Sequence, residues 1–122
     1  MRYLVRPADV APYSPANHEG TRNFRLIGPE TVGARQVEVL IGDIERGKGA
    51  LPHAHPGIEQ VCYLLEGTAH VEVAGESFEM QPGDACFFPE NELHLFKATS
   101  PKARVLVIYT PPYGENPKNV RR

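Results

Sequence analysis

From residue 36 onward, the chain alternates hydrophobic and polar positions in short runs that are separated by turn residues. The strand candidates are 36–45, 60–66, 68–74, 77–80, 84–88, 93–98 and 103–110. The run 60–66 is largely apolar, as a strand covered on both faces would be, whereas 36–45 and 68–74 alternate. Alternation with a period of two residues is typical of strands that bury one face. Glycine or proline stands between most of these runs, and no stretch has convincing helical periodicity. The pattern therefore predicts an all-β sandwich or barrel.

The first part of the chain lacks this regularity. Residues 1–29 are polar, are punctuated by proline and glycine, and hold two short strand candidates, Tyr3–Arg6 and Asn23–Ile27. A segment of this length cannot bury itself, so we expect an irregular N-terminal arm over 1–29 that packs on a barrel over 30–122 or on a second subunit. We expect a homodimer in which strands from the first 28 residues extend the sheet edge of the partner.

Length and composition narrow the function classes. The 122 residues suit a single domain, and 41% hydrophobic residues can fill one core. The formal net charge of −2 gives no sign of a nucleic-acid partner, and no apolar run is long enough for a membrane span. The N-terminal residues lack a secretory signal pattern, so we expect a cytoplasmic protein. In that compartment Cys62 and Cys86 are expected to be free thiols.

The densest candidate chemistry lies between residues 47 and 60 and at residue 94. His53 and His55 stand two residues apart, so in an extended backbone they point to the same face. His94 follows a predicted turn much later in the chain. Three imidazoles and one oxygen make a plausible ligand set for a first-row metal. A lone His-x-His pair is a weak signal, because two histidines of the core or surface give the same pattern.

The residues around these histidines resemble the two motifs of the cupin superfamily. Gly47, His53, His55, position 60 and Gly67 fit the spacing of the first motif, with Gln60 where the family usually has Glu. The second motif is matched at Gly83, Pro89 and His94, whereas Asn91 replaces its glycine and Ala98 its asparagine. The resemblance covers the motif core 36–110 and implies a single-domain cupin jelly-roll β-barrel, or double-stranded β-helix.

The same resemblance implies that the metal ligands are His53, His55, Gln60 and His94, with Fe, Mn, Ni or Zn as the divalent ion. Strand alternation favours Gln60 over Glu59 as the inward residue. A set of neutral ligands leaves the charge of the ion uncompensated, so we expect a small anionic or enolisable substrate. Alternation from Gln60 and His94 places Cys62, Leu64 and Phe96 on the inner face, as candidates for the substrate pocket. Tyr109 flanks the final turn and is a further pocket candidate, with ordinary packing as the alternative.

The ligand spacing is also similar to that of small cupins that open unsaturated uronate rings. Those enzymes place an Asp and an Arg near the last strand, where this chain has Val107 and Tyr113. The resemblance therefore favours a metal-dependent enzyme with dioxygenase-like oxidoreductase chemistry over a metal-dependent isomerase or lyase of sugar acids. A binding cupin that holds a small molecule without turnover is the alternative from another functional class, and a purely structural cupin is the third.

Overall fold

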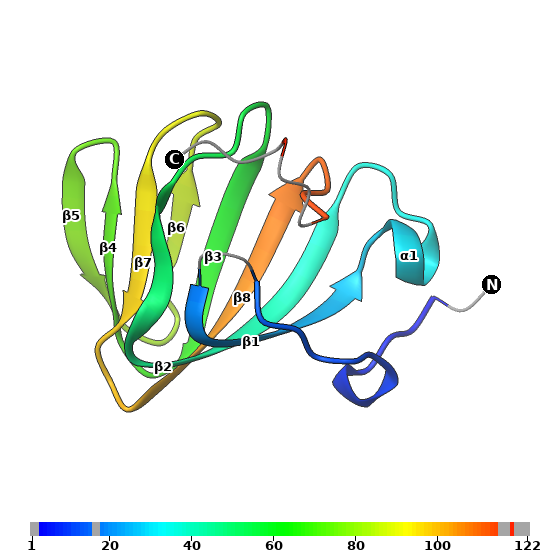
Figure 1. The fold of residues 1–122 in the computed structure, drawn as a ribbon, viewed down its shortest axis with the longest axis horizontal. Coiled ribbons are helices and arrows are strands. Elements are labelled where there is room, and N and C mark those ends of the chain that lie inside the picture. The colour runs from blue at the N-terminus through cyan, green and yellow to red at the C-terminus, as the bar shows by residue number, and fades with distance from the viewer. Residues whose placement is uncertain (1–2, 16–17, 115–117, 119–122) are drawn as a thin grey trace.

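The computed structural model describes residues 3–15, 18–114 and 118. Within these residues the chain is built almost entirely of strands (Figure 1). The strands are β1 (His18–Ile27), β2 (Glu38–His53), β3 (Glu59–Glu66), β4 (Ala69–Val73), β5 (Glu76–Met80), β6 (Ala85–Phe88), β7 (His94–Ala98) and β8 (Lys102–Thr110). The two short helical turns are η1 (Pro7–Asp9) and α1 (Pro29–Val32). None of the helices in the described residues is long and apolar enough to span a membrane.

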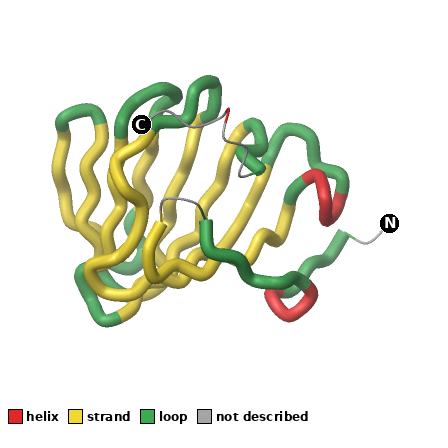
Figure 2. Tube along the Cα trace, in the orientation of Figure 1, coloured by secondary structure: helices red, strands yellow, loops and turns green. Residues whose placement is uncertain are grey.

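The strands form one curled antiparallel sheet. Its order is β5-β4-β7-β2-β8-β3-β6, and β1 pairs with β2 beside this path. Val71 of β4, near one end of the sheet, belongs to the same hydrophobic cluster as Leu64 of β3 and Phe88 of β6, near the other end. The two ends of the sheet therefore close around a common core, which makes the fold a nearly closed barrel (Figure 2).

Burial follows the predicted alternation closely. In β8 every second residue is buried, from Ala103 to Tyr109, and in β4 Ala69, Val71 and Val73 point into the core. These strands confirm the sequence-based expectation because each has one face against the core and one face outside. The inner face of the sheet is thus apolar along most of its length, apart from the end at which the histidines lie.

Strand β2 is longer than the sequence pattern predicted. The alternating run ends at residue 45 and two glycines follow, Gly47 and Gly49, yet the strand runs through them to His53. Both glycines have positive φ, 74° and 138°, and a Cβ on Gly49 would lie 2.2 Å from the carbonyl oxygen of Phe96. They bend β2 so that its first half pairs with β8 and its last residues pair with β7. This bend carries the chain from one half of the barrel to the other.

The N-terminal arm differs from the expectation in two respects. Tyr3–Arg6 forms no strand, and the prediction there was wrong: its side chains are mostly exposed, and Pro7 starts a 3-10 turn instead. The second candidate, Asn23–Ile27, is part of the longer strand β1, which begins at His18 and pairs with β2 of the same chain. The first β contact of the arm is the bridge between Tyr13 and Asn23.

Candidate metal centre

Three histidines meet at one end of the barrel. His53 ends β2 and His94 begins β7, and the two residues are register partners in the antiparallel pair. His55 lies two residues beyond His53, in the turn before β3. Their ring centroids are 4.5–5.3 Å apart, and one nitrogen of each ring lies within 4.8 Å of the other two. All three side chains are buried.

Backbone carbonyls orient two of these rings. Nδ1 of His53 donates to the carbonyl oxygen of Leu51 at 2.6 Å, and Nδ1 of His94 donates to that of Glu92 at 3.2 Å. Because a carbonyl oxygen only accepts, both Nδ1 atoms carry the proton and both Nε2 atoms keep a lone pair for another contact. This arrangement is the usual second layer of a histidine metal site.

Backbone hydrogen bonds also fix the chain around His55. Its carbonyl oxygen accepts hydrogen bonds from the N–H groups of Ile58, at 3.3 Å, and of Asn91, at 3.1 Å. The first bond closes the turn at Pro56 and Gly57, and the second joins this turn to the loop before β7. The positions of His55 and His94 are therefore linked through the backbone.

Gln60 supplies the oxygen of the candidate site. It is the second residue of β3 and is buried, whereas the neighbouring Glu59 is exposed, as strand alternation predicted. Its Nε2 donates to Sγ of Cys62 at 3.4 Å. Its Oε1 is buried and has no hydrogen-bond partner among the described residues. Burying an amide oxygen without a hydrogen-bond partner lowers the stability of the fold, so the site is suited to a ligand that this oxygen can bind.

This group of donors fits a divalent metal. Three neutral imidazoles and one amide oxygen are ligands that Fe, Mn, Co, Ni and Zn accept. The three histidines form the one such cluster found among the described residues. His53, His55, His94 and Gln60 thus remain the proposed ligands, and the structure brings all four to one end of the barrel.

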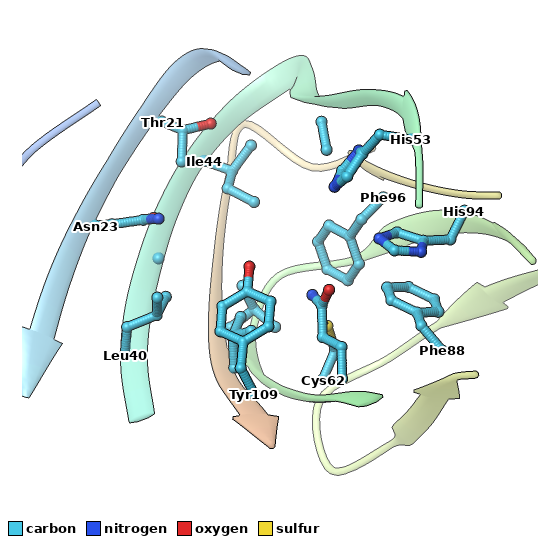
Figure 3. A pocket seen from close by; sticks show the side chains of 15 residues that line it. Thr21, Asn23, Leu40, Ile44, His53, Cys62, Phe88, His94, Phe96 and Tyr109 are labelled. Atoms are coloured by element: carbon cyan, nitrogen blue, oxygen red, sulfur yellow. The ribbon is translucent and has the colours of Figure 1, made fainter. Parts of the chain in front are cut away.

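The cavity beside the histidines is small, with about 40 Å³ of space for water-sized molecules, and it is partly open to solvent. Most of its wall is apolar, and Figure 3 shows the His53, His94, Phe96 and Tyr109 side chains around it. The residues that line it are Thr21, Asn23, Leu40, Gly42, Ile44, Ala50, His53, Gln60, Cys62, Phe88, His94, Phe96, Val105, Val107 and Tyr109. None of these described lining residues is acidic.

Three of the four predicted pocket residues line this cavity, namely Cys62, Phe96 and Tyr109. Leu64 does not. Its side chain is inward but 0% exposed, and it lies deeper along β3 in the hydrophobic core. Strand alternation identifies which face a residue occupies but not its depth along the barrel, so the placement of Leu64 in the pocket was wrong.

Aromatic rings flank two of the histidines. The ring of Phe88 stacks on His94 with centroids 4.1 Å apart and an interplanar angle of 9°. Tyr113, beyond the end of β8, lies over His55 with centroids 4.5 Å apart, and Tyr109 approaches the same ring at 5.4 Å. These rings limit how far the imidazoles turn, and Tyr113 also contacts Tyr109 of the cavity wall, with ring centroids 5.2 Å apart.

The polar residues of β1 are the part of the site that the sequence did not reveal. Thr21 and Asn23 line the cavity from the arm (Figure 3). Asn23 is the register partner of Gly42, and a Cβ on Gly42 would lie 2.9 Å from Oδ1 of Asn23. Gly42 therefore leaves room for the amide. The available signal was the spacing of these two polar residues, which stand two positions apart at the start of a strand candidate.

The sequence has relatives among proteins of polyketide synthesis. A protein named polyketide synthase CurC, from Streptomyces cyaneus, is 26% identical over 112 residues, which cover 92% of this chain and 73% of the relative. The tetracenomycin polyketide synthase protein TcmJ, from Streptomyces glaucescens, is 30% identical over 83 residues. That match covers 66% of this chain and 54% of TcmJ, so it spans about half of that relative's length.

Solved structures give the same fold. The polyketide cyclase RemF from Streptomyces resistomycificus superposes with a TM-score of 0.79 at 26% identity, covering 100% of this chain and 85% of RemF. KdgF from Halomonas sp. has a TM-score of 0.81 at 20% identity, covering 94% and 98% of the two chains, and this likeness concerns the fold alone. The family described as "Cupin domain" matches residues 40–109. The chain therefore belongs to the cupin family, and its barrel is the jelly roll that the two motifs implied.

Proposed function

We propose that this cupin is a metal-dependent enzyme that cyclises a small substrate carrying several enolisable carbonyl groups. The observation that carries the proposal is the donor set: three buried histidines and the amide oxygen of Gln60 at one end of an apolar cavity. The relatives named as polyketide synthase proteins and the polyketide cyclase RemF support the substrate class. Chains of alternating carbonyl groups are the substrates of such chemistry.

The charge balance of the site explains the preference for enolisable substrates. All four proposed ligands are neutral when they bind, and the described cavity lining has no acidic residue. A divalent ion held there would polarise a carbonyl oxygen as a Lewis acid. Neighbouring carboxylates would compete for that charge, so their absence from the described lining favours a substrate that brings its own negative oxygen.

Residues of the chain would position the remaining carbonyl groups. Asn23, Thr21 and Tyr109 line the cavity with groups that can donate hydrogen bonds, and the Tyr109 hydroxyl points into it (Figure 3). Phe96, Ile44 and Leu40 form apolar wall that excludes water from the folded substrate. The chain thus has the parts to bend a flexible substrate so that its carbonyl groups meet.

The test uses the metal-loaded protein with a synthetic thioester that carries three alternating keto groups, in air, with product masses and oxygen uptake measured together. An intramolecular aldol condensation releases one water and consumes no oxygen, so the product is lighter than the substrate by one water. Protein with His94→Ala should lose the activity, whereas the surface variant His70→Gln should keep it. Turnover that survives in His94→Ala, or no turnover with any divalent metal, would contradict the proposal.

Dioxygenase-like oxidation of a small enolisable acid or ketone is the second candidate. It is favoured by the same histidine cluster and by a cavity whose wall is rich in aromatic residues, including Phe88 and Phe96. The same experiment separates the two, because a dioxygenase adds both atoms of O₂ to its substrate. Isomerase or lyase chemistry on a sugar acid leaves the elemental composition unchanged or splits the molecule. Metal-dependent binding without any product would indicate the non-catalytic binding cupin.

A further inference from the structure

Two cysteines face each other across strands β3 and β6. Cys62 and Cys86 are direct register partners in this antiparallel pair. Register partners point to the same side of a sheet, with Cα atoms about 4.5 to 5.5 Å apart. That separation lies within the range of about 4.4 to 6.8 Å that a disulfide spans. Both residues are free thiols in this structure, and the two side chains hydrogen bond with each other.

The two thiols do not belong to the cluster of metal-ligating side chains. Among the described residues, the one cluster of three or more such groups consists of His53, His55 and His94. Two thiols alone are too few for a structural zinc site, which takes four ligands. The chemistry that suits an isolated pair of touching thiols is oxidation to a disulfide.

Solvent reaches the two thiols unequally. Cys62 is 2% exposed and lines the cavity (Figure 3), whereas Cys86 is half-buried. Strand β6 stands at one end of the sheet order, and β3 is its strand neighbour within the described residues. One side of β6 therefore has no strand paired with it there. A small oxidant meets Cys86 first, and Cys62 is the buried thiol that faces the oxidised sulfur.

The cysteine pair lies beside the candidate metal centre on both strands. On β3, Nε2 of Gln60 donates to Sγ of Cys62 at 3.4 Å. On β6, Phe88 follows two residues after Cys86, and its ring stacks on His94. Gln60 and Phe88 are themselves register partners. A chemical change at the cysteine pair therefore acts on a side chain that holds the proposed ligand Gln60.

We propose that Cys62 and Cys86 are a redox modification site that forms a reversible disulfide with hydrogen peroxide. The sulfur of Cys86 attacks one peroxide oxygen, the O–O bond breaks, and the thiol proton leaves with the other oxygen as water. The sulfur of Cys62 then attacks the resulting sulfenic sulfur, the S–O bond breaks, and its thiol proton leaves in a second water. The two thiols lose two electrons, which the peroxide gains. A dithiol reductant reverses the reaction.

The disulfide changes the support of Gln60. Bond formation brings the two sulfurs to about 2.05 Å, so Sγ of Cys62 moves toward β6. Nε2 of Gln60 then loses its hydrogen bond to this sulfur, and the amide is free to rotate. Contacts that orient a metal ligand contribute about tenfold to a hundredfold to metal affinity, so oxidation should weaken zinc binding by about tenfold. This consequence rests on the proposed ligand role of Gln60, whereas the disulfide itself does not.

The first test identifies the cysteine products. The full-length chain is treated with a small excess of hydrogen peroxide, blocked with iodoacetamide in urea and digested with a protease that cuts after glutamate. Trypsin is unsuitable because no Lys or Arg stands between residues 49 and 96. Cutting after glutamate leaves Cys62 in the peptide 60–66 and Cys86 in the peptide 80–90. We expect these two peptides to be joined, in a chain that keeps its monomer mass, and dithiothreitol to separate them.

Three results would overturn the disulfide. They are two thiols that both still take up iodoacetamide, a cross-link between two chains, and Cys86 oxidised to sulfinic acid while Cys62 stays a thiol. In Cys62→Ala, Cys86 lacks its partner and should proceed to sulfinic acid. If it stays a thiol in this variant, the order of attack is wrong. If Cys62→Ala does not fold by circular dichroism, the products of the original protein decide.

The second test measures zinc affinity by chelator competition before and after oxidation, with the peroxide removed. The original protein should bind zinc about tenfold more weakly when oxidised. Cys86→Ser cannot form the disulfide, so the same treatment should leave its affinity unchanged. Equal affinity of the oxidised and reduced original protein, or an equal loss in Cys86→Ser, would overturn the effect on the metal site. If Gln60→Ala binds zinc as the original protein does, the ligand assignment fails, and the joined peptides still decide the disulfide.

Discussion

Nε of Arg25 donates a 3.1 Å hydrogen bond to Oε2 of Glu38, a side chain with 0% exposure. The other carboxylate oxygen of Glu38 accepts a 2.8 Å hydrogen bond from the N–H of Gly114, directly after the tyrosine that covers His55. Arg25 also donates to the hydroxyl of Tyr13 at 3.1 Å. One buried carboxylate therefore joins the N-terminal arm, β1, β2 and the segment that closes the histidine site.

We expect Glu38→Gln to destabilise the protein by about 2–3 kcal/mol, because it leaves a half-buried guanidinium without its buried counter-charge. The matched control is Glu30→Gln, which removes the other, 51% exposed carboxylate partner of Arg25. Its effect should stay below about 1 kcal/mol. Urea unfolding measures the free energy of unfolding of both variants. Equal decreases would show that the burial of Glu38 does not make its ion pair more stabilising than the exposed one.

Gln60→Glu should strengthen metal binding by about tenfold or more, because it places a negative charge beside the divalent ion. Gln60→Ala should weaken it, since it removes the buried Oε1 donor. Competition titration with a chromogenic chelator measures both affinities. Glu59→Gln, which changes charge on the exposed neighbour, should leave the affinity unchanged. If Gln60→Glu and Gln60→Ala bind metal as the original protein does, residue 60 is not a ligand.

His70 predicts a pH-dependent stability away from the metal site. Hydrogen bonds to Glu72 and then to Glu79 raise its pKa above the ordinary 6.5. Because folding raises this pKa, protonated His70 stabilises the folded protein. The stabilisation is fully present below pH 6.5 and is lost as pH rises through the higher pKa of the folded state. His70→Gln should therefore lower the melting temperature more in mildly acidic than in alkaline buffer. A difference in melting temperature between the original protein and His70→Gln that stays constant or grows as pH rises would contradict this assignment.

The two cysteines should differ in reactivity although they are register partners on β3 and β6. A hydrogen bond with Cys86 and burial raise the pKa of the Cys62 thiol, whereas the hydrogen bond from Cys62 lowers that of the half-buried Cys86. Iodoacetamide should modify Cys86 at least about tenfold faster than Cys62. Peptide mass spectrometry over time measures the two rates, with urea-unfolded protein as the control. Equal rates in the folded protein would rule out the difference.

Much of the barrel was predictable because strand alternation is a local signal. Cys62 was placed on the inner face by alternation from Gln60 and Phe96 by alternation from His94, and both side chains are buried there. Depth along the barrel is set by how neighbouring strands are staggered, which alternation does not encode, and Leu64 was misplaced for that reason. Gly47 and Gly49 look like a turn in sequence, but only the three-dimensional path shows that their positive φ bends a continuous strand.

The contributions of the N-terminal arm were hidden for a different reason. Thr21 and Asn23 reach the cavity because β1 pairs with β2, a contact between residues distant enough in sequence that no local pattern reveals it. The pairing of Arg25 with Glu38 is equally non-local, and the sequence shows only two ordinary charged residues at those positions. A site residue that reaches the cavity through strand pairing is not visible in local sequence patterns unless a family motif includes it.

The central claim is that the histidine cluster holds a divalent metal. Elemental mass spectrometry of protein purified without an affinity tag tests it most directly, for the original chain beside His53→Ala/His94→Ala and the surface variant His70→Gln. We predict near-stoichiometric iron, manganese, nickel or zinc in the original chain and in His70→Gln, and none in the double variant. Equal metal content in all three proteins, or no bound metal in the original chain after reloading with each of these ions, would contradict the claim.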